Sequence, residues 1–155
     1  MITAQVESLT QTLDEMKPLF PTHWEDLALN KDAVPLDPDY SVYLRRDAVG
    51  EVLLVTLRET GRLIGYFVGF IAPSLHYKTC LTGTMDIYYI LPEKRGGTKA
   101  LRLFRCVLNE MNRRGVRRVF MGSKLHKDTG RLFEALDMQP VETYYSRMLE
   151  GYKRW

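Results

Sequence analysis

The chain has 155 residues, which suits one domain with a modest hydrophobic core and leaves little room for a second. It is 45% hydrophobic and 26% charged, the composition of an ordinary globular protein, which excludes a disordered or fibrous chain. The net charge of +3 accommodates an anionic ligand but does not by itself indicate nucleic acid binding.

Membrane and metal functions find no support in the sequence. The apolar runs are far shorter than the roughly 20 residues needed to span a bilayer, and Met1–Leu13 lacks the pattern of a signal peptide. We therefore expect a cytoplasmic protein. Cys80 and Cys106 lack the spacing of metal ligands, and we expect no metal.

The chain begins with a segment that predicts helices. Ala4–Met16 has apolar residues at helical spacing, so we expect an amphipathic first helix there. Pro18 and Pro21 are expected to break it, because proline lacks the N–H that a helix interior needs. His23–Leu29 then predicts a second, short helix.

A third helix is predicted after a polar, proline-containing link. Asp37-Pro38-Asp39 supplies a cap, a proline at the first position and an acidic residue in the first turn. Tyr40 and Tyr43 lie at helical spacing, and the helix is expected to end near Gly50. A strand over Ser41–Arg45 is the alternative.

A change of period marks the start of the sheet. Val52–Leu57 and Leu63–Ile71 read as two strands joined by the tight turn Glu59-Thr60-Gly61, which predicts a β-hairpin. Gly65 and Gly69 within the second strand predict a bulge or a close approach of another backbone.

The segment Asp86–Gly115 reads as a strand, a glycine turn and an amphipathic helix. Ile87–Leu91 is the strand, and Pro92 ends it. The turn begins with Arg95-Gly96-Gly97, and the helix that follows is expected to end at Gly115. Because a helix start presents unpaired N–H groups and partial positive charge, this turn predicts a seat for a phosphate group. A plain, solvated connection is the alternative.

The last third of the chain completes a mixed α/β sheet. Arg118–Gly122 predicts a short strand parallel to Ile87–Leu91, because a helix separates the two. Thr129–Leu136 predicts a short helix, and Val141–Leu149 a final strand with incomplete alternation. We expect one α/β domain over residues 1–155, with a sheet that is antiparallel at its start and parallel in its middle.

This order of elements resembles the GNAT acetyltransferase superfamily. The family's phosphate loop reads Gln or Arg, two residues of any kind, Gly, one of any kind, then Gly or Ala. Arg95 and Ala100 match this pattern, whereas Thr98 stands where its first glycine belongs. The family often ends with "Y-E-K-x-G-F", and Phe133-Glu134-Ala135-Leu136-Asp137-Met138 occupies that place here, with Phe133 in place of the tyrosine.

The resemblance covers about residues 51–149 as the core and places residues 1–50 as a helical wall on the substrate side. Within the superfamily the chain is most similar to small stand-alone members, including ones carried by phages, with Leu75-His76-Tyr77-Lys78 before the central strand. The implied function is transfer of an acetyl group from acetyl-CoA to a primary amine by direct attack. In that reading the backbone N–H of Ile90 polarises the thioester carbonyl, and the pyrophosphate sits on the glycine turn. The implied acetyl-CoA-binding residues are Tyr89, Ile90, Leu91, Arg95, Gly96, Gly97, Thr98, Lys99 and Ala100.

Amine acetylation requires that the amine loses a proton, and a departing thiolate benefits from gaining one. The family's usual acid is the tyrosine replaced by Phe133, so Tyr144 and Tyr145 on the predicted last strand are candidate substitutes. Departure of the thiolate without an acid is the alternative. Three residues are candidate bases: Asp86, His76 and His126. The alternatives are a solvated acid at the end of a strand for Asp86, a loop histidine that holds a backbone group for His76, and a surface role for His126; for the two histidines these alternatives are favoured.

Two other functions stay open at this stage. Phe133 and Thr98 motivate a catalytically weak CoA-binding module, or a protein-inhibitory module, on the same fold. The basic segment Arg113–Arg118 motivates nucleic acid association, although cations at the end of a helix explain it more simply. The acceptor amine is not readable from the sequence, and a homodimer stays open.

Overall fold

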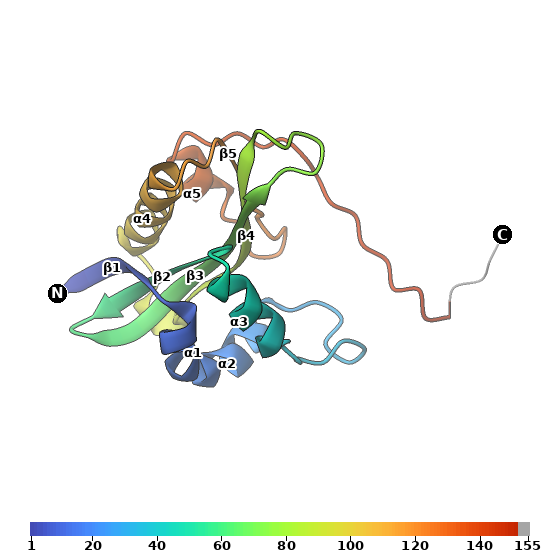
Figure 1. Ribbon diagram of the computed structural model, residues 1–155. Coiled ribbons are helices and arrows are strands. Elements are labelled where there is room, and N and C mark those ends of the chain that lie inside the picture. Colours follow the sequence, from blue (N-terminus) through green and yellow to red (C-terminus); the bar gives the residue numbers. More distant parts are fainter. Residues whose placement is uncertain (152–155) are drawn as a thin grey trace.

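The computed structural model describes residues 1–151, and residues 152–155 of the expected domain lie outside this part of the chain. Within residues 1–151 the centre is a five-stranded sheet with the strand order β1-β2-β3-β4-β5, as Figure 1 shows. Neighbouring strands run antiparallel from β1 to β4, whereas β4 and β5 run parallel. This arrangement confirms the predicted mixed sheet. The elements are β1 (Ile2–Glu7), α1 (Leu9–Met16), the 3-10 helix η1 (Lys17–Leu19), α2 (Phe20–Leu27), α3 (Tyr40–Ala48), β2 (Val52–Glu59), β3 (Arg62–Pro73), β4 (Leu81–Ile90), the 3-10 helix η2 (Pro92–Lys94), α4 (Lys99–Arg113), β5 (Arg118–Phe120) and α5 (Gly130–Glu134).

The first predicted helix is wrong over its first half. Ile2–Glu7 forms β1, which pairs with β2 from Ile2 opposite Glu59 to Glu7 opposite Leu54. The free edge of β2 offers six residues a hydrogen-bonding partner, and this pairing outweighs the weak helical periodicity. Helix α1 begins only after Ser8, whose hydroxyl accepts a hydrogen bond from the N–H of Gln11.

Helix α1 ends at Met16, before Pro18, as predicted, but the chain continues in helical turns through both prolines. Pro18 and Pro21 occupy first-turn positions of η1 and α2, where the missing N–H has no helical partner to lose. Helix α2 therefore begins at Phe20, three residues before the prediction. Helix α3 is confirmed and the alternative strand is wrong, but the cap is Asp39 and not Asp37 as predicted. The Asp39 carboxylate accepts a hydrogen bond from the N–H of Val42, so Pro38 lies before the helix.

The predicted hairpin and its close backbone approaches are confirmed. Strands β2 and β3 pair with a register shift between Leu57 and Arg58. A second shift separates Val68 from Gly69, because Gly69 lies opposite Met85 and Val68 opposite Ile87. A Cβ atom added at Gly65 would lie 2.7 Å from the carbonyl oxygen of Tyr89. Strand β3 can therefore approach β4 this closely only with glycine at that position.

Strands β4 and β5 are paired over a short stretch and then diverge. Only Thr82–Thr84 of β4 pairs with Arg118–Phe120 within residues 1–151. The following residues of β4, from Met85 to Ile90, still pair with β3 on their other side. This divergence opens the sheet in front of α4, which begins at Lys99 and ends at Arg113, close to the predicted end at Gly115, whose φ is +83°.

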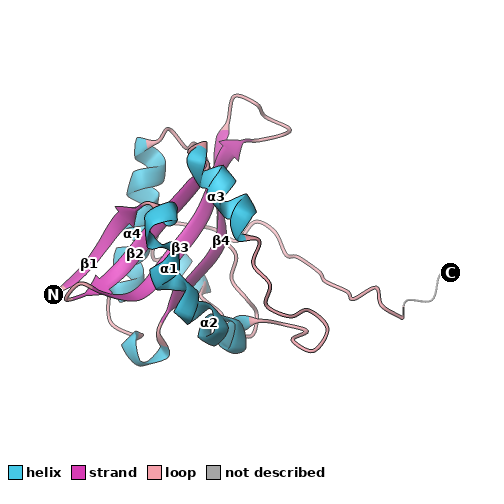
Figure 2. Cartoon of the chain, turned by 60° about the horizontal axis from the view of Figure 1, so that its bottom comes forward, coloured by secondary structure: helices cyan, strands magenta, loops and turns pink. Residues whose placement is uncertain are grey.

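The helices form two layers around the sheet. Helices α1, α2 and α3 cover one face, and α4 with α5 covers the other (Figures 1 and 2). Helix α4 packs on β1, β2 and β3 through apolar side chains that include Leu103, Phe104, Val107 and Met111. No helix within residues 1–151 has the length and hydropathy needed to cross a membrane.

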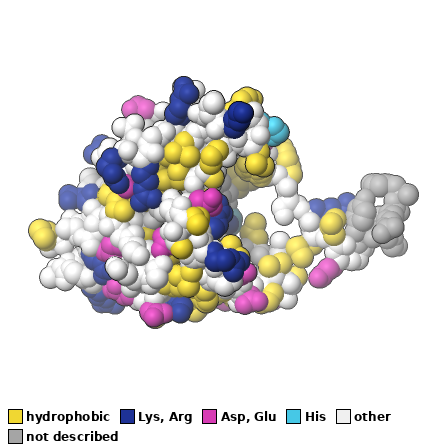
Figure 3. All heavy atoms as spheres, in the orientation of Figure 1, with side chains coloured by type: hydrophobic (Ala, Val, Ile, Leu, Met, Phe, Trp, Pro, Cys, Tyr) yellow, Lys and Arg dark blue, Asp and Glu magenta, His cyan; other side chains and the backbone are white. Residues whose placement is uncertain are grey.

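The predicted final strand is wrong. Residues 138–149 form no helix or strand; Met138 still packs on the core, and the later part of the segment runs away from the body of the protein (Figures 1 and 3). The apolar side chains of this segment do not alternate with period two, because they are spaced by three, one, three and one residues: Val141, Tyr144, Tyr145, Met148 and Leu149. A strand formed by this segment would thus place apolar side chains on both of its faces, so no single face would favour pairing with the sheet.

Candidate functional site

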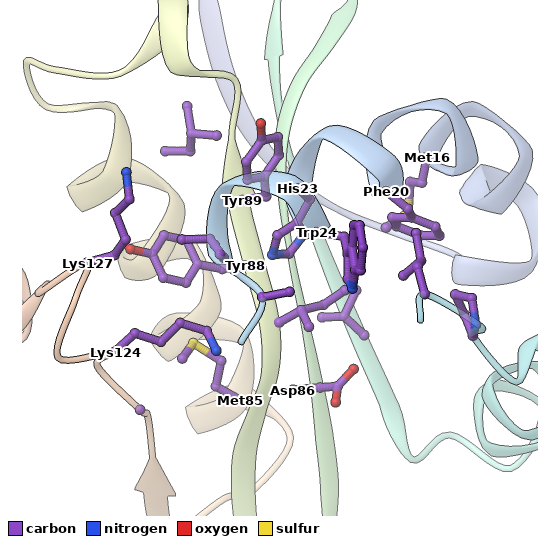
Figure 4. Close-up of a pocket in the computed structure, with 18 of the residues that line it drawn as sticks. Met16, Phe20, His23, Trp24, Met85, Asp86, Tyr88, Tyr89, Lys124 and Lys127 are labelled. Atoms are coloured by element: carbon purple, nitrogen blue, oxygen red, sulfur yellow. The ribbon is translucent and has the colours of Figure 1, made fainter. Parts of the chain in front are cut away.

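A cavity of about 780 Å³ lies where β4 diverges from β5. Figure 4 shows that its walls come from α1 and α2 on one side, from β4 in the middle, and from the segment after β5 on the other. The two sides differ in chemistry, with aromatic and aliphatic side chains toward the helices and lysines after β5.

Asp86 lies at the bulge of β4 and faces this cavity. It is the extra residue between Met85 and Ile87, and such a bulge redirects a side chain out of the regular alternation. Tyr43 of α3 donates a hydrogen bond from its hydroxyl to the Asp86 carboxylate. Desolvation by the surrounding protein raises the pKa of Asp86, while the bond from Tyr43 opposes this shift. The pKa of Tyr43 is raised by burial and by its bond to the carboxylate.

A group of stacked rings lies above Asp86 on the helix side. The imidazole of His23 stacks on Tyr89 with ring centres 4.6 Å apart, and its Nδ1 shares a 2.7 Å hydrogen bond with the hydroxyl of Tyr66. Burial disfavours the imidazolium and lowers the pKa of His23 to about 4, so the ring is neutral at pH 7. Tyr89 is 1% exposed, and no side chain within residues 1–151 meets hydrogen-bond geometry with its hydroxyl.

Tyr88 points to the opposite side of the sheet and lines the same cavity. Its ring packs edge-to-face on Phe104 at 5.0 Å, and Phe104 packs likewise on Phe133 at 5.3 Å. Figure 4 shows the Tyr88 hydroxyl directed toward Lys127. Burial raises the pKa of Tyr88, so it remains a protonated phenol at neutral pH. Phe133, at 7% exposure, is a core residue beneath it.

Cations gather at the end of the cavity near the glycine turn. Arg95 donates from Nε to the carbonyl oxygen of Ile90 at 2.9 Å and forms an ion pair with Asp26 of α2. Lys127 lies 3.2 Å from the other oxygen of Asp26. The Arg95 guanidinium, followed by Lys127, holds the pKa of Asp26 below its usual range. These two cations are thus placed to bind one oxyanion between them.

The glycine turn leaves room for a ligand beside the start of α4. Gly96 and Gly97 have φ values of +98° and +62°, and a Cβ atom at either position would meet nothing within 4 Å. Thr98 precedes the first residue of α4 without a side-chain cap bond, so its hydroxyl does not satisfy the N–H groups of the first turn. The backbone is therefore accessible where the helix dipole favours an anion.

The backbone of Ile90 faces the gap that β5 leaves. The N–H of Leu91 donates to the carbonyl oxygen of Ile64, at the end of the β3 ladder. Because successive N–H groups of a strand point to opposite sides, the N–H of Ile90 points away from β3. The carbonyl of Ile90 lies on that same side, where Arg95 reaches it.

The structure brings together some of the residues predicted from sequence and leaves others apart. Asp86, Tyr89, Ile90, Arg95, Gly96 and Ala100 line the cavity. Leu91, Gly97, Thr98 and Lys99 adjoin these residues in the chain but do not line it. His76 lies in the connection between β3 and β4, and His126 in the connection after β5; neither lines the cavity. Tyr144 and Tyr145 are 83% and 93% exposed and lie outside it.

The sequence interpretation missed several residues of the site. His23, Tyr43 and Tyr66 come from three different elements, and Lys124 and Lys127 come from a connection that carries no motif. One signal was available for Tyr43, because the Asp39 cap fixes the start of α3 and places Tyr40 and Tyr43 one turn apart on one face.

Comparison with solved structures shows the fold. The chain is similar to a ribosomal-protein-alanine N-acetyltransferase from Brucella melitensis biovar Abortus 2308, at a TM-score of 0.70 and 18% identity over 96% of this chain and 99% of that one. It is similar to a predicted acetyltransferase with acetyl-CoA from Clostridium acetobutylicum, at a TM-score of 0.70 and 14% identity over 99% and 100% of the chains. An aminoglycoside acetyltransferase from an uncultured soil metagenomic sample gives a TM-score of 0.75 at 12% identity over 96% and 98%.

No protein-family model matches the chain, and neither does the sequence of any curated protein. The likeness thus resides in the arrangement of the elements, and it shows that the chain has the fold of the GNAT acetyltransferases.

Proposed function

We propose that this chain, which has the GNAT fold, is an N-acetyltransferase that moves an acetyl group from acetyl-CoA to a primary amine. One observation carries the proposal. The cavity at the β4–β5 divergence combines a carboxylate at the bulge of β4 with a helix start flanked by cations. The carboxylate can accept a proton from an amine, and the helix start with its cations can bind a phosphate.

The residues present fit acetyl-CoA. Gly96 and Gly97 leave the backbone accessible at the start of α4, where the pyrophosphate would lie. Arg95 and Lys127 would exchange the Asp26 carboxylate for a phosphate oxygen. The N–H of Ile90, directed into the gap, would donate to the thioester carbonyl.

In the reaction that we propose, the amine nitrogen attacks the carbonyl carbon of the acetyl thioester. A C–N bond forms, the C–S bond breaks, and CoA leaves as a thiolate. The N–H of Ile90 stabilises the developing oxyanion, a contact of the kind worth about 3 kcal/mol. Asp86 accepts a proton from the attacking amine, directly or through a water molecule.

Tyr88 is the proton donor to the thiolate in this proposal. The residue at the position of the family's acid is Phe133, which has no proton to give and lies in the core. Tyr88 lines the cavity, and its ring packs on Phe104, which in turn packs on Phe133. Because burial raises its pKa, Tyr88 stays protonated at neutral pH. Tyr144 and Tyr145, the substitutes expected from sequence, are far more exposed and lie outside the cavity.

Binding of acetyl-CoA tests the donor half of the proposal. Isothermal titration calorimetry with acetyl-CoA should show binding, and Arg95→Glu should weaken it by about tenfold or more, since a hydrogen bond between charged groups contributes roughly 1.5–3 kcal/mol. Arg105→Glu is the matched control, because Arg105 is exposed on α4 and does not line the cavity. No binding at millimolar acetyl-CoA, or equal affinity of the two variants, would contradict the proposal.

A catalytically weak CoA-binding module is the second candidate. The observation that favours it is the apolar Phe133 in place of an acid. It differs from the enzyme in one measurable respect, because it binds acetyl-CoA but releases no CoA thiol when amines are added.

A further inference from the structure

We propose that the acceptor is a small primary amine carried on an apolar or aromatic body, in the manner of an arylalkylamine. This inference rests on the proposed acetyl transfer and concerns the half of the cavity that lies against α1, α2 and α3. Two independent features of that half carry it, the distribution of charge and the exposure of aliphatic side chains.

Charge is sparse on the helix side. Among the residues of chain 1–151 that line the cavity there, only Asp86 and Asp37 carry a formal charge at neutral pH, because His23 is neutral. Asp37 lies in the connection before α3, whereas Asp86, which is also exposed, is the carboxylate on β4 in the middle of the cavity wall. Arg95 lies at the end of the cavity near the glycine turn, where it pairs with Asp26 of α2, and Lys124 and Lys127 line the wall after β5 together with Asp128. This part of the cavity offers the Asp86 carboxylate to pair with a positive charge, which suits an amine with one ammonium group and not a polyamine.

The interior around Asp86 is apolar. Figure 4 shows Trp24, Phe20 and Met16 from the helices on the same side of β4 as Asp86. The aromatic face of Trp24 and the ring of Phe20 suit a flat, apolar body, and aromatic rings also attract an ammonium group.

The entrance carries aliphatic side chains that the protein itself does not cover. Leu29, Val34 and Leu36 of the connection between α2 and α3 all line the cavity, and they are 58%, 49% and 40% exposed. Exposed apolar side chains gathered at the rim of a cavity favour a ligand that removes them from water. A polyamine or an aminosugar would present polar groups to these three side chains.

The test compares four acceptors by the release of CoA thiol from acetyl-CoA. The acceptors are 2-phenylethylamine, spermidine, kanamycin and a short peptide with an N-terminal alanine. We expect kcat/KM for 2-phenylethylamine to exceed the others by at least about tenfold, the discrimination that one or two apolar contacts supply. Leu36→Ser should lower that kcat/KM by about tenfold through KM, since it removes a rim contact and no reacting group.

Leu75→Ser is the matched control, because Leu75 is 100% exposed in a connection outside the cavity. Preference for spermidine, kanamycin or the peptide overturns the inference, and so does binding of acetyl-CoA with no acetylation of 2-phenylethylamine. Calorimetry separates this outcome from failure of the proposed function, which would show as the absence of acetyl-CoA binding.

Discussion

Replacing Tyr43 by phenylalanine should shift the pH dependence of the reaction and leave the cavity otherwise intact. In the folded protein the Tyr43 hydroxyl donates to the Asp86 carboxylate, a bond that favours the charged form. A hydrogen bond to a charged group contributes roughly 1.5–3 kcal/mol. Because Asp86 is open to the cavity, we take the lower end, which corresponds to about a tenfold change in the equilibrium between the protonated and charged forms of Asp86.

The direction in which kcat/KM changes with pH follows from the role of Asp86 as the general base. Desolvation already raises the pKa of Asp86, and loss of the bond raises it further in Tyr43→Phe. Below the pKa of Asp86 in the unaltered protein, the variant therefore has about one tenth as much carboxylate. Above the raised pKa both proteins are fully ionised. The ratio of variant to wild-type kcat/KM should rise from about one tenth to about one across this range.

The assay is the release of CoA thiol from acetyl-CoA at a series of pH values with one amine. Taking the ratio at each pH cancels the ionisation of the amine itself, which is the same for both proteins. Tyr40→Phe is the control, because Tyr40 lines the same cavity but does not bond to Asp86. A ratio that does not vary with pH, or an equal effect of Tyr40→Phe, would refute Asp86 as the base.

Three further changes test other parts of the structure. Tyr88→Phe should lower kcat by about one to two orders of magnitude, as loss of a general acid does, with unchanged affinity for acetyl-CoA by calorimetry. Gly65→Ala should lower the free energy of unfolding by about 1–3 kcal/mol in urea titrations, because the new Cβ lies 2.7 Å from a backbone oxygen of β4. Glu7, whose pKa is lowered from 4.5 to about 2 chiefly by its bonds from Arg58, stabilises the fold above pH 4.5 and loses that contribution as the pH falls toward 2. When the pH falls from 6 to 3, the free energy of unfolding should therefore decrease by about 2 kcal/mol less in Glu7→Gln than in the unaltered protein. Urea titrations at both pH values can measure this difference.

Each of these changes has a matched control. Tyr77→Phe removes a hydroxyl outside the cavity and should leave kcat unchanged. Gly122→Ala adds a methyl group that meets nothing within 4 Å and should leave the stability unchanged. Glu142→Gln removes an exposed carboxylate outside the Arg58 network and should not alter the acid sensitivity. If a control variant had the same measured effect as its test variant, the physical reason given for that prediction would be wrong.

Local sequence signals were sufficient to predict the elements that neighbouring residues determine. The hairpin of β2 and β3, the presence of helix α3 after Asp37-Pro38-Asp39, and the glycine turn before α4 each depend on residues close together in the chain. The predicted order of these elements agreed with the fold because each has a clear period or a clear end signal.

The signals failed where distant segments decide the structure. Residues Ile2–Glu7 have a weak helical pattern but pair with β2 residues 47 to 57 positions away, and become a strand. For Val141–Leu149 the reverse holds, because strand-forming residues without a clean alternation find no partner within residues 1–151. The sequence alone does not indicate which strand edges of the sheet are free to pair with another segment.

The candidate site divides in the same way. The glycine turn and Arg95 could be found from a motif in one segment. The hydrogen bond between His23 and Tyr66 joins residues 43 positions apart, and so does the bond between Tyr43 and Asp86. Such pairs exist only after the helices have packed on the sheet, and no spacing in the sequence predicts them.

The short pairing of β4 with β5 also affects how the protein responds to a ligand. Strands β2, β3 and β4 are joined by long antiparallel ladders, whereas β5 is attached to the sheet by three residue pairs. A molecule that contacts both Asp86 and the segment after β5 would hold together two parts of the chain that the sheet joins only weakly. By mass action, such a ligand at a hundred times its Kd adds about 2.7 kcal/mol to the free energy of unfolding. The melting temperature of this protein should therefore rise with the concentration of any molecule that spans the divergence.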